Sequence, residues 1–356
     1  MEGGRLLSGP RGRRLCLELM MHLDEEVRAA TYSAAYELDP GAGTSRSRFV
    51  FGEDPGEPPT VAPEDVAAAL DQVTLGAPSE AALLHALDLA VSMARYWQEP
   101  DGEDLLAAHP AVSAALERVA GVVVETPEAV WWAEPIERTS QHLVSWWEEG
   151  HPFRPTRDAA AALAVWRAEA EAEEARAARE RPTDPAARWS GVWWSTPPVA
   201  LASTTRLLPD RGPVGLSFVE DFGGWEEASV EAVSVPAGAR VLEIDGPEAW
   251  ADLCRRHPLP VTASRRHDWF RTTGRGDVAW VQPDWASVAG EVDAVHVSVW
   301  GYLTTAGLAG SVDDGVASVL AGWSPDATYW LTGQPEGSGF PRRWTLDNDS
   351  REWRPA

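Results

Sequence analysis

The sequence predicts an α+β protein, in which an all-helical N-terminal region is followed by a mixed or antiparallel α+β C-terminal domain. Apolar residues recur at helical spacing between residues 60 and 150. After residue 188, short runs of β-type residues outnumber the helical segments, and the connections are too short for repeated βαβ units. Between these regions, residues 157–181 are rich in alanine, glutamate and arginine, which indicates a solvated connecting helix.

These changes of composition divide the chain into three predicted parts. Residues 1–59 are expected to form an N-terminal helix and an irregular segment. Residues 60–182 are expected to form a helical domain that ends with the connecting helix, because Pro182 stops it. Residues 183–356 form the expected α+β domain, in which we place the candidate site.

Helices dominate the elements expected in the first 150 residues. Apolar residues predict one helix over 14–38, and the glycines and prolines of 39–62 predict a loop around the apolar run Phe49-Val50-Phe51. Pro63 opens another helix, because proline and acidic residues favour the first helical turn. The further helical segments are 79–97, 108–121 and 137–149.

The C-terminal half alternates short strands with shorter helices. Apolar and β-branched runs predict the strands 191–195, 214–219, 229–235, 239–244, 278–281, 295–299 and 328–331. Helical segments are expected at 247–256 and 284–291, and the residues from 332 to the end lack periodicity, which predicts an irregular tail. His296, on one of these strands, is expected to be a hydrogen-bonded core or cross-strand histidine.

Composition excludes several classes of function. All 30 basic residues are arginine, so the chain has no lysine for a Schiff base, a P-loop or a kinase strand. The formal net charge of −25 argues against nucleic acid or an anionic membrane as partner. No apolar run approaches a membrane span and acidic residues interrupt the N-terminal one, so we expect a cytoplasmic protein. The two cysteines, Cys16 and Cys254, form no ligand cluster, and no metal is predicted.

The most informative segment is 255–275, which holds six arginines and one acidic residue. Arginine binds phosphate and carboxylate through paired hydrogen bonds, so we expect an anion-recognition loop that uses Arg265, Arg266 and Arg271. Trp269 could stack on a ring, and His267 is a candidate acid or base. The alternative is that these arginines pair with the protein's own acidic residues.

Three other segments supply candidate ligand-binding or catalytic residues. Strand-end hydroxyls and aromatic rings can hold a sugar, a phosphate or a base, and a carboxylate at the end of an apolar strand can act as an acid or base. The candidates are Trp194, Ser195, Thr196, Arg206 and Tyr302 for ligand binding and Glu220 for catalysis. The alternatives are a buried strand that ends in a proline turn and a solvated acidic turn.

The order of these elements between residues 189 and 331 resembles the ADP-ribosyltransferase-like fold. The resemblance rests on a short strand with a small-residue turn, a strand before an acidic turn, a proline-led strand and a late strand with aspartate after its first hydrophobic residue. These are residues 191–196, 214–221, 235–245 and 292–297. Ser190, Gly191 and Val192 stand where family members usually carry histidine or arginine, and His296, Ser298 and Trp300 occupy the region of the family's catalytic glutamate.

This resemblance implies a transferase that uses NAD. Tryptophan rings would stack on the cofactor's rings, arginines would hold its pyrophosphate, and one acid or base would orient the acceptor. The corresponding residues are Trp194 and Trp269, then Arg206, Arg265 and Arg266, then Glu220 or His267.

Two other classes of function remain open on the sequence. The first is a non-enzymatic interaction protein of immunity or regulatory type, whose acidic helical half meets a basic protein partner. Its motivation is the acidity of residues 1–150 and the pairs Trp131-Trp132 and Trp146-Trp147, since tryptophan is frequent in interface hot spots. The second is a tailoring enzyme of small-molecule biosynthesis.

Overall fold

The computed structural model describes residues 1–47, 60–148, 150–347 and 351–356. The predicted run 49–51 therefore lies outside the described residues. By its internal contacts the chain divides into two units, residues 1–90 with 98–131 and residues 91–97 with 132–356. This division differs from the expected boundary at residue 182, because β1 (Gln141–Glu148) pairs with later strands and α8 (Ala159–Glu180) packs beside later helices.

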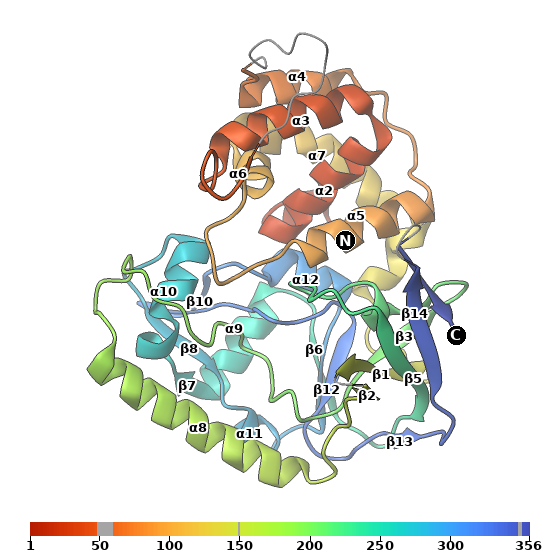
Figure 1. The fold of residues 1–356 in the computed structure, drawn as a ribbon, viewed down its shortest axis with the longest axis vertical. Helices are drawn as coiled ribbons and strands as arrows, with labels where there is room; N and C mark the ends of the chain where they lie inside the picture. Colours follow the sequence, from red (N-terminus) through yellow and green to blue (C-terminus); the bar gives the residue numbers. More distant parts are fainter. Residues whose placement is uncertain (48–59, 149, 348–350) are drawn as a thin grey trace. The chain divides into compact units, whose positions relative to one another are not determined.

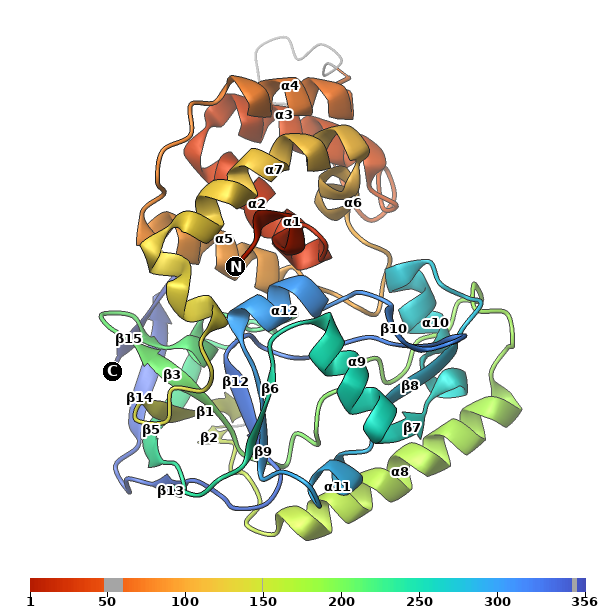
Figure 2. The same ribbon diagram turned by 180° about the vertical axis from the view of Figure 1, so that it is seen from behind.

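The first unit is helical, and the fold class predicted from the sequence is confirmed. Its helices are α1 (Gly3–Leu6), α2 (Pro10–Leu23), α3 (Glu25–Leu38), α4 (Pro63–Gln72), α5 (Glu80–Ser92), α6 (Gly102–Ala108) and α7 (Pro110–Glu125). Figures 1 and 2 show these helices packed around one another. The helix predicted over 14–38 is two helices, because Asp24 is extended and caps α3 by accepting a hydrogen bond from Val27 N at 2.9 Å.

Buried ion pairs join the helices of the first unit. Arg14 of α2 donates to Glu18 at 2.7 Å and to Asp101 at 2.8 Å, and it also contacts Asp104. Arg11, one turn earlier, donates to the Ala90 carbonyl at 3.0 Å. The carboxylates that Arg14 contacts are themselves largely buried, so its positive charge compensates for their loss of contact with water.

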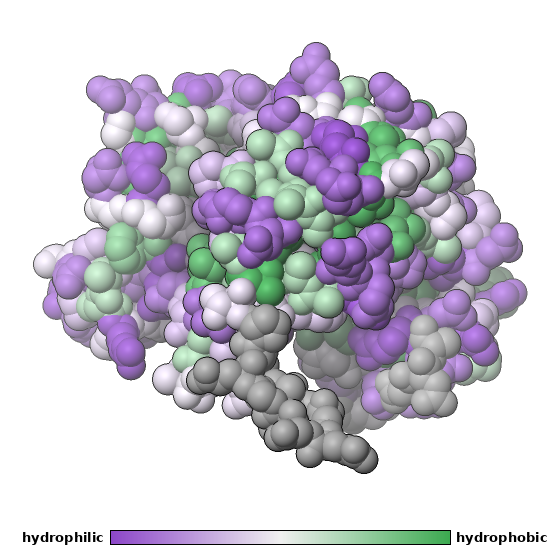
Figure 3. Space-filling model, turned by 90° about the horizontal axis from the view of Figure 1, so that it is seen from above, coloured by the Kyte–Doolittle hydropathy of each residue, from purple (hydrophilic) through white to green (hydrophobic). Residues whose placement is uncertain are grey.

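Hydrophilic side chains cover much of the face seen in Figure 3, with smaller groups of hydrophobic side chains between them. Exposed large hydrophobic residues of the first unit include Leu23 and Tyr32. Single exposed apolar residues of this kind are ordinary on a protein surface.

The second unit contains two sheets. The larger sheet has eleven strands, and its main path runs β15-β14-β5-β1-β3-β12-β9-β6, in which only the β6–β9 pair is parallel. Its remaining bounds are β2 (His151–Pro152), β3 (Ser203–Leu208), β4 (Gly212–Pro213), β5 (Glu227–Ser234), β6 (Val241–Ile244), β9 (Ala294–Val297), β12 (Ala327–Trp330), β13 (Glu336–Gly337), β14 (Arg342–Asp347) and β15 (Glu352–Pro355). The smaller sheet has the order β10-β11-β8-β7, with bounds β10 (Gly310–Asp313), β11 (Val316–Ser318), β8 (Ala279–Pro283) and β7 (Pro258–Pro260).

Short helices lie beside these sheets, and buried tryptophans fill the core between them. The helices are α9 (Pro247–Arg256), α10 (Thr262–Thr273), α11 (Trp285–Val288) and α12 (Val299–Thr305). The rings of Trp250, Trp285 and Trp323 lie 5.9–6.5 Å apart in tilted and edge-on arrangements. Aromatic rings bury large areas in such contacts, which accounts for part of the high tryptophan count.

Four expected elements are corrected by the structure. The predicted helix 137–149 is strand β1, because Val144 and Trp146 lie opposite Val230 and Ala228 of β5, where β-branched and aromatic side chains pack well. The tail beyond 332 is not irregular, because β14 pairs with both β5 and β15. Residues 191–195 and 214–219 are not strands. The first is extended without a neighbouring strand, and the second contains the 3-10 turn η2 (Val214–Leu216).

The two tryptophan pairs lie in different surroundings. Trp132 is buried at 1% exposure. Trp146 stacks on Trp225 with ring centroids 5.2 Å apart, and Trp147 lies 4.8 Å beneath the guanidinium of Arg343. Trp146 therefore packs within an aromatic cluster of the second unit.

His296 is hydrogen-bonded in the core, as its strand position predicted. Its Nδ1 lies 2.5 Å from a Glu243 oxygen and its Nε2 lies 3.4 Å from Asp326, which also accepts Nε of Arg206 at 2.6 Å. Burial opposes the charged form of His296, but the hydrogen bonds to Asp326 and Glu243 outweigh burial and raise its pKa. The histidine is therefore an ionic link between β9, β6 and the turn before β12.

Replacing Arg14 by methionine should destabilise the helical unit by about 3–5 kcal/mol, because buried Glu18 and Asp101 lose their cation. Urea unfolding followed by circular dichroism measures this loss. The control is Arg28→Met, which removes an exposed pair with Glu25 and should leave the transition unchanged. Equal transitions for both variants would contradict a structural role for the Arg14 network.

Stability should depend on pH through His296. Because its pKa is higher in the folded protein, the stability that its charge adds is fully present below about pH 6.5 and is lost as the pH rises through the folded value. The difference in unfolding free energy between the wild type and His296→Gln should therefore be larger at pH 6 than at pH 9. Denaturant titrations at both pH values test this, and a difference that grows toward pH 9 would refute it.

Candidate functional site

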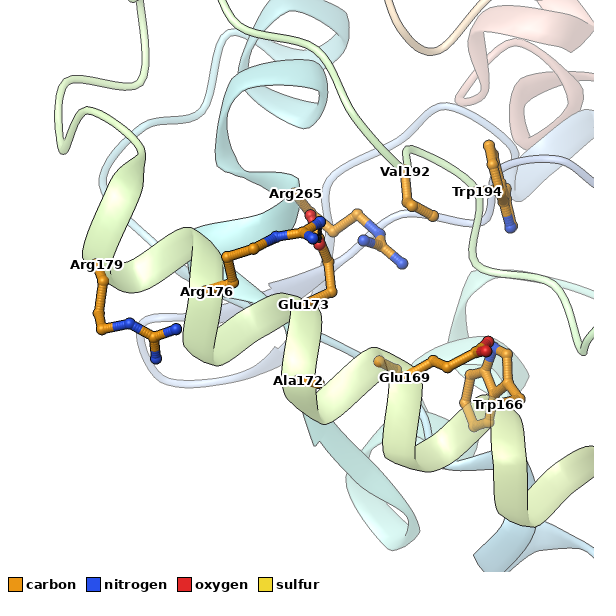
Figure 4. A pocket seen from close by; sticks show the side chains of 10 residues that line it. Trp166, Glu169, Ala172, Glu173, Arg176, Arg179, Val192, Trp194 and Arg265 are labelled. Carbon is orange, nitrogen blue, oxygen red and sulfur yellow. Dashed lines mark hydrogen bonds and ion pairs between the residues drawn. The ribbon is translucent and has the colours of Figure 1, made fainter.

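A cavity of about 580 Å³ opens in the second unit between α8, the extended segment 191–194 and α10 (Figure 4). This volume lies within the ordinary range for small-molecule sites. From α8 come Trp166, Glu173 and Arg176 among others, and the opposite side presents Trp194 and Arg265. The lining residues of α8 recur at spacings of three and four, so they lie on one face of the helix.

Helix α10 occupies most of the segment in which an arginine-rich loop was expected. The carboxylate of Glu174 on α8 accepts the N–H groups of Ala263 at 2.7 Å and Ser264 at 2.8 Å. A carboxylate in this place satisfies backbone donors that the helix cannot and interacts favourably with its dipole. Gly274 ends the helix in the left-handed conformation with φ of +70°. The segment is therefore a helix fixed to α8, and the expectation of a loop was wrong.

Four of the six arginines in this segment pair with acidic residues of the same unit, as the alternative interpretation held. Arg271 contacts Asp268. The other three pairs lie at the surface and join Arg255 and Arg256 to Asp252 and Arg275 to Asp277. Arg266 instead donates to the Thr183 carbonyl at 3.1 Å.

Arg265 differs from the others because it is 5% exposed and lies at the cavity. Its Nη2 reaches Gln282 only at 3.4 Å, and its Nε has no hydrogen-bond partner among the described residues. Burial lowers the pKa of its guanidinium to about 10. In Figure 4 the end of the side chain points toward Val192 and Trp194.

The carboxylates around Arg265 are engaged elsewhere. Glu174 caps α10, Glu173 contacts Arg176 and Arg181, and Asp268 binds the segment before Trp194. These carboxylates act on Arg265 by electrostatic attraction at a distance and make no direct hydrogen bond to it. Its charge consequently lacks a direct counterion in the part of the chain that the structure describes.

Asp268 of α10 holds the segment that carries Trp194. Its carboxylate accepts Ser190 Oγ at 2.9 Å and Gly191 N at 3.0 Å, and it also contacts Arg271. Trp269 adds a hydrogen bond from its indole nitrogen to the Trp193 carbonyl at 2.7 Å. These bonds replace the strand pairing expected for 191–195 and place the half-exposed ring of Trp194 at the cavity.

Gly191 also contributes by lacking a side chain. A Cβ atom there would lie 2.9 Å from a guanidinium nitrogen of Arg181. That guanidinium donates to the Ser264 carbonyl at 2.8 Å and contacts Glu173. A side chain at position 191 would therefore require the guanidinium of Arg181, which ties the end of α8 to α10, to shift.

Among the predicted site residues, the structure brings Trp194 and Arg265 to one cavity. The others are engaged in the body of the second unit. Ser195 and Thr196 are buried, and Ser195 Oγ accepts Ala321 N at 3.0 Å. Arg206 is paired with Asp326 on the large sheet, and the Trp269 ring is buried against Trp280. Arg271 contacts Asp268 and the carbonyls of Trp97 and Trp189.

Neither predicted acid–base residue is among the residues that line this cavity. Glu220 accepts the Tyr302 hydroxyl at 2.9 Å and the N–H of Gly322, against which the Trp194 Cβ is closely packed. His267 donates from Nδ1 to the Pro185 carbonyl at 3.3 Å. Burial is the main cause that lowers the pKa of His267, so it is neutral near pH 7.

Sequence reasoning missed the contribution of α8. Residues 157–181 were interpreted as a solvated connector, but the helix supplies one wall of the cavity and the carboxylate that caps α10. This contribution could have been predicted from the spacing of Trp166, Glu169, Glu173 and Arg176. That spacing places one aromatic and three charged side chains on the same face of the helix.

No family model, curated protein or solved structure compared with the chain matches it. Within the described residues, no group of three or more histidine, cysteine or acidic side chains is arranged to hold a metal ion. The described helices include none that is long and apolar enough to cross a membrane alone. Helices α6 and α7, which are bent by 80° at the break between them, are together long and apolar enough for a membrane span by length and composition only.

Replacing Asp268 by asparagine should destabilise the second unit by about 2–4 kcal/mol, because an amide nitrogen would face the donors that the buried carboxylate accepts. Thermal unfolding measures the loss, and tryptophan fluorescence should shift as the Trp193–Trp194 segment is released. Asp277→Asn, which alters an exposed pair with Arg275, is the control and should behave as the wild type. An unchanged Asp268→Asn protein would refute the role assigned to this carboxylate.

Proposed function

We propose that the second unit binds a small anion that carries a flat ring, in the cavity beneath α8. The observation that supports this is the buried guanidinium of Arg265, which has no direct counterion among the described residues. Buried charges in proteins are normally paired, and an anion in the cavity would complete the pairing. Trp166 and Trp194 line the same cavity and offer aromatic surfaces to the rest of the ligand.

A nucleotide-like ligand is the narrower form of this proposal, with NAD as the first compound to test. Two residues expected to contact NAD support it, because Trp194 and Arg265 line one cavity. Glu220 and His267 are engaged outside its lining, so the proposal is one of binding. Transfer of ADP-ribose by an enzyme of the ADP-ribosyltransferase-like type is proposed only if NAD binds.

The direct test is thermal unfolding of the full chain with millimolar NAD, ADP-ribose or adenosine. A ligand at about 100 times its dissociation constant should stabilise the protein by about 2.7 kcal/mol. Charged compounds should raise the unfolding temperature and neutral adenosine should raise it less. The absence of a shift with NAD and ADP-ribose would remove the nucleotide-like form of the proposal.

The variant Arg265→Met provides the decisive contrast. Removing a buried charge without a direct counterion should leave the free protein as stable as the wild type or more stable, while it abolishes stabilisation by charged ligands. The matched control is Arg275→Met, which changes an exposed arginine of the same segment and should retain ligand stabilisation. A destabilised Arg265→Met protein would show that the guanidinium serves the fold instead.

A further inference from the structure

The charged groups around the cavity beneath α8 favour a particular ligand charge, and this inference rests on the proposed function. Arg265 is the buried cation at the cavity, and its guanidinium points toward Val192 and Trp194 (Figure 4). Arg176 and Arg179 also line the cavity, but both are exposed to solvent, and Arg176 is paired with Glu173. One positive charge is therefore available in the desolvated part of the cavity.

The carboxylates around this cation oppose a second negative charge. Glu173, Glu174 and Asp268 act on Arg265 through their electrostatic field, although each makes its direct bonds to other groups. Arg181, which is paired with Glu173, acts on Arg265 in the opposite direction, so the three carboxylates outnumber the one cation in this field. A singly charged anion beside Arg265 neutralises the guanidinium. A doubly charged anion would leave an excess negative charge among these carboxylates after losing more of its hydration.

The remaining surface favours a flat apolar body. Trp166 and Trp194 line the cavity with the short apolar side chains of Val192, Ala170 and Ala172. Such a lining provides area for an aromatic ring. The other charged residues of the lining, Glu169, Glu173, Arg176 and Arg179, come from α8, and Arg265 is the buried cation among them. We infer that this site selects an aromatic monoanion, a planar ring that carries one carboxylate, over dianionic phosphate monoesters.

A series built on one ring separates charge from shape. The probes are 2-naphthoate, neutral 2-naphthamide and 2-naphthyl phosphate, which is doubly charged at pH 8 because the second pKa of a phosphate monoester is about 6. Calorimetry with the full chain at pH 8 should give 2-naphthoate an affinity at least tenfold higher than either of the others. In Arg265→Met the preference for 2-naphthoate over 2-naphthamide should disappear.

A second variant tests the repelling carboxylates. Glu173→Gln should reduce the preference for 2-naphthoate over 2-naphthyl phosphate at least threefold, because it removes one negative charge at the cavity. Glu171→Gln, an exposed residue of the same helix that is absent from the cavity lining, is the control and should keep the wild-type preference. An unchanged preference in Glu173→Gln would overturn the electrostatic argument.

The outcomes separate this inference from the proposed function. If 2-naphthyl phosphate binds more tightly than 2-naphthoate and both depend on Arg265, the proposed site stands and the selection of a monoanion is wrong. If none of the three probes binds, or if binding is the same in Arg265→Met, both the site and its selectivity are overturned.

Discussion

The cavity in the second unit depends on two carboxylates that bind backbone N–H groups. Glu174 holds the first turn of α10 against α8, and Asp268 holds the segment 190–191 against α10. Without these bonds, the partly buried donors at the start of α10 and at Gly191 would lose their partners in the protein. Side-chain carboxylates therefore hold two of the cavity walls in place.

This arrangement suits a chain whose cations are all arginine. A guanidinium has five donors in a rigid plane, so it can contact several oxygens on different elements at once. Arg14 joins α2 to Asp101 at the start of α6 in the first unit, and Arg206 joins β3 to Asp326 in the second. Arg265 lies among the same kinds of groups with a single long hydrogen bond. That contrast supports a role in ligand binding.

The sequence was sufficient for the fold class and for most helices, because their start signals and apolar spacing are local. Pro63 and Pro247 each begin a helix as expected. The strand at 141–148 was missed because the spacing of its apolar residues fits both a helix and a strand. Its pairing with β3 and β5 depends on residues more than 50 positions away in the sequence. Within the site, Trp194 and Arg265 were identified by residue type and local charge. The roles of Glu173, Glu174 and Asp268 depend on the packing of α8 against α10, which no local pattern encodes.

The adjacent residues Glu173 and Glu174 have a consequence for the orientation of α8. Side chains of neighbouring helical residues point about 100° apart, so Glu174 can reach the start of α10 while Glu173 faces the cavity beside Arg181. A turn of α8 about its own axis would break both sets of contacts at once. Few apolar side chains of α8 are buried, so these two carboxylates determine which face of the helix borders the cavity. An insertion or deletion of one residue between Trp166 and Glu173 would move Trp166 off that face while leaving the helix intact.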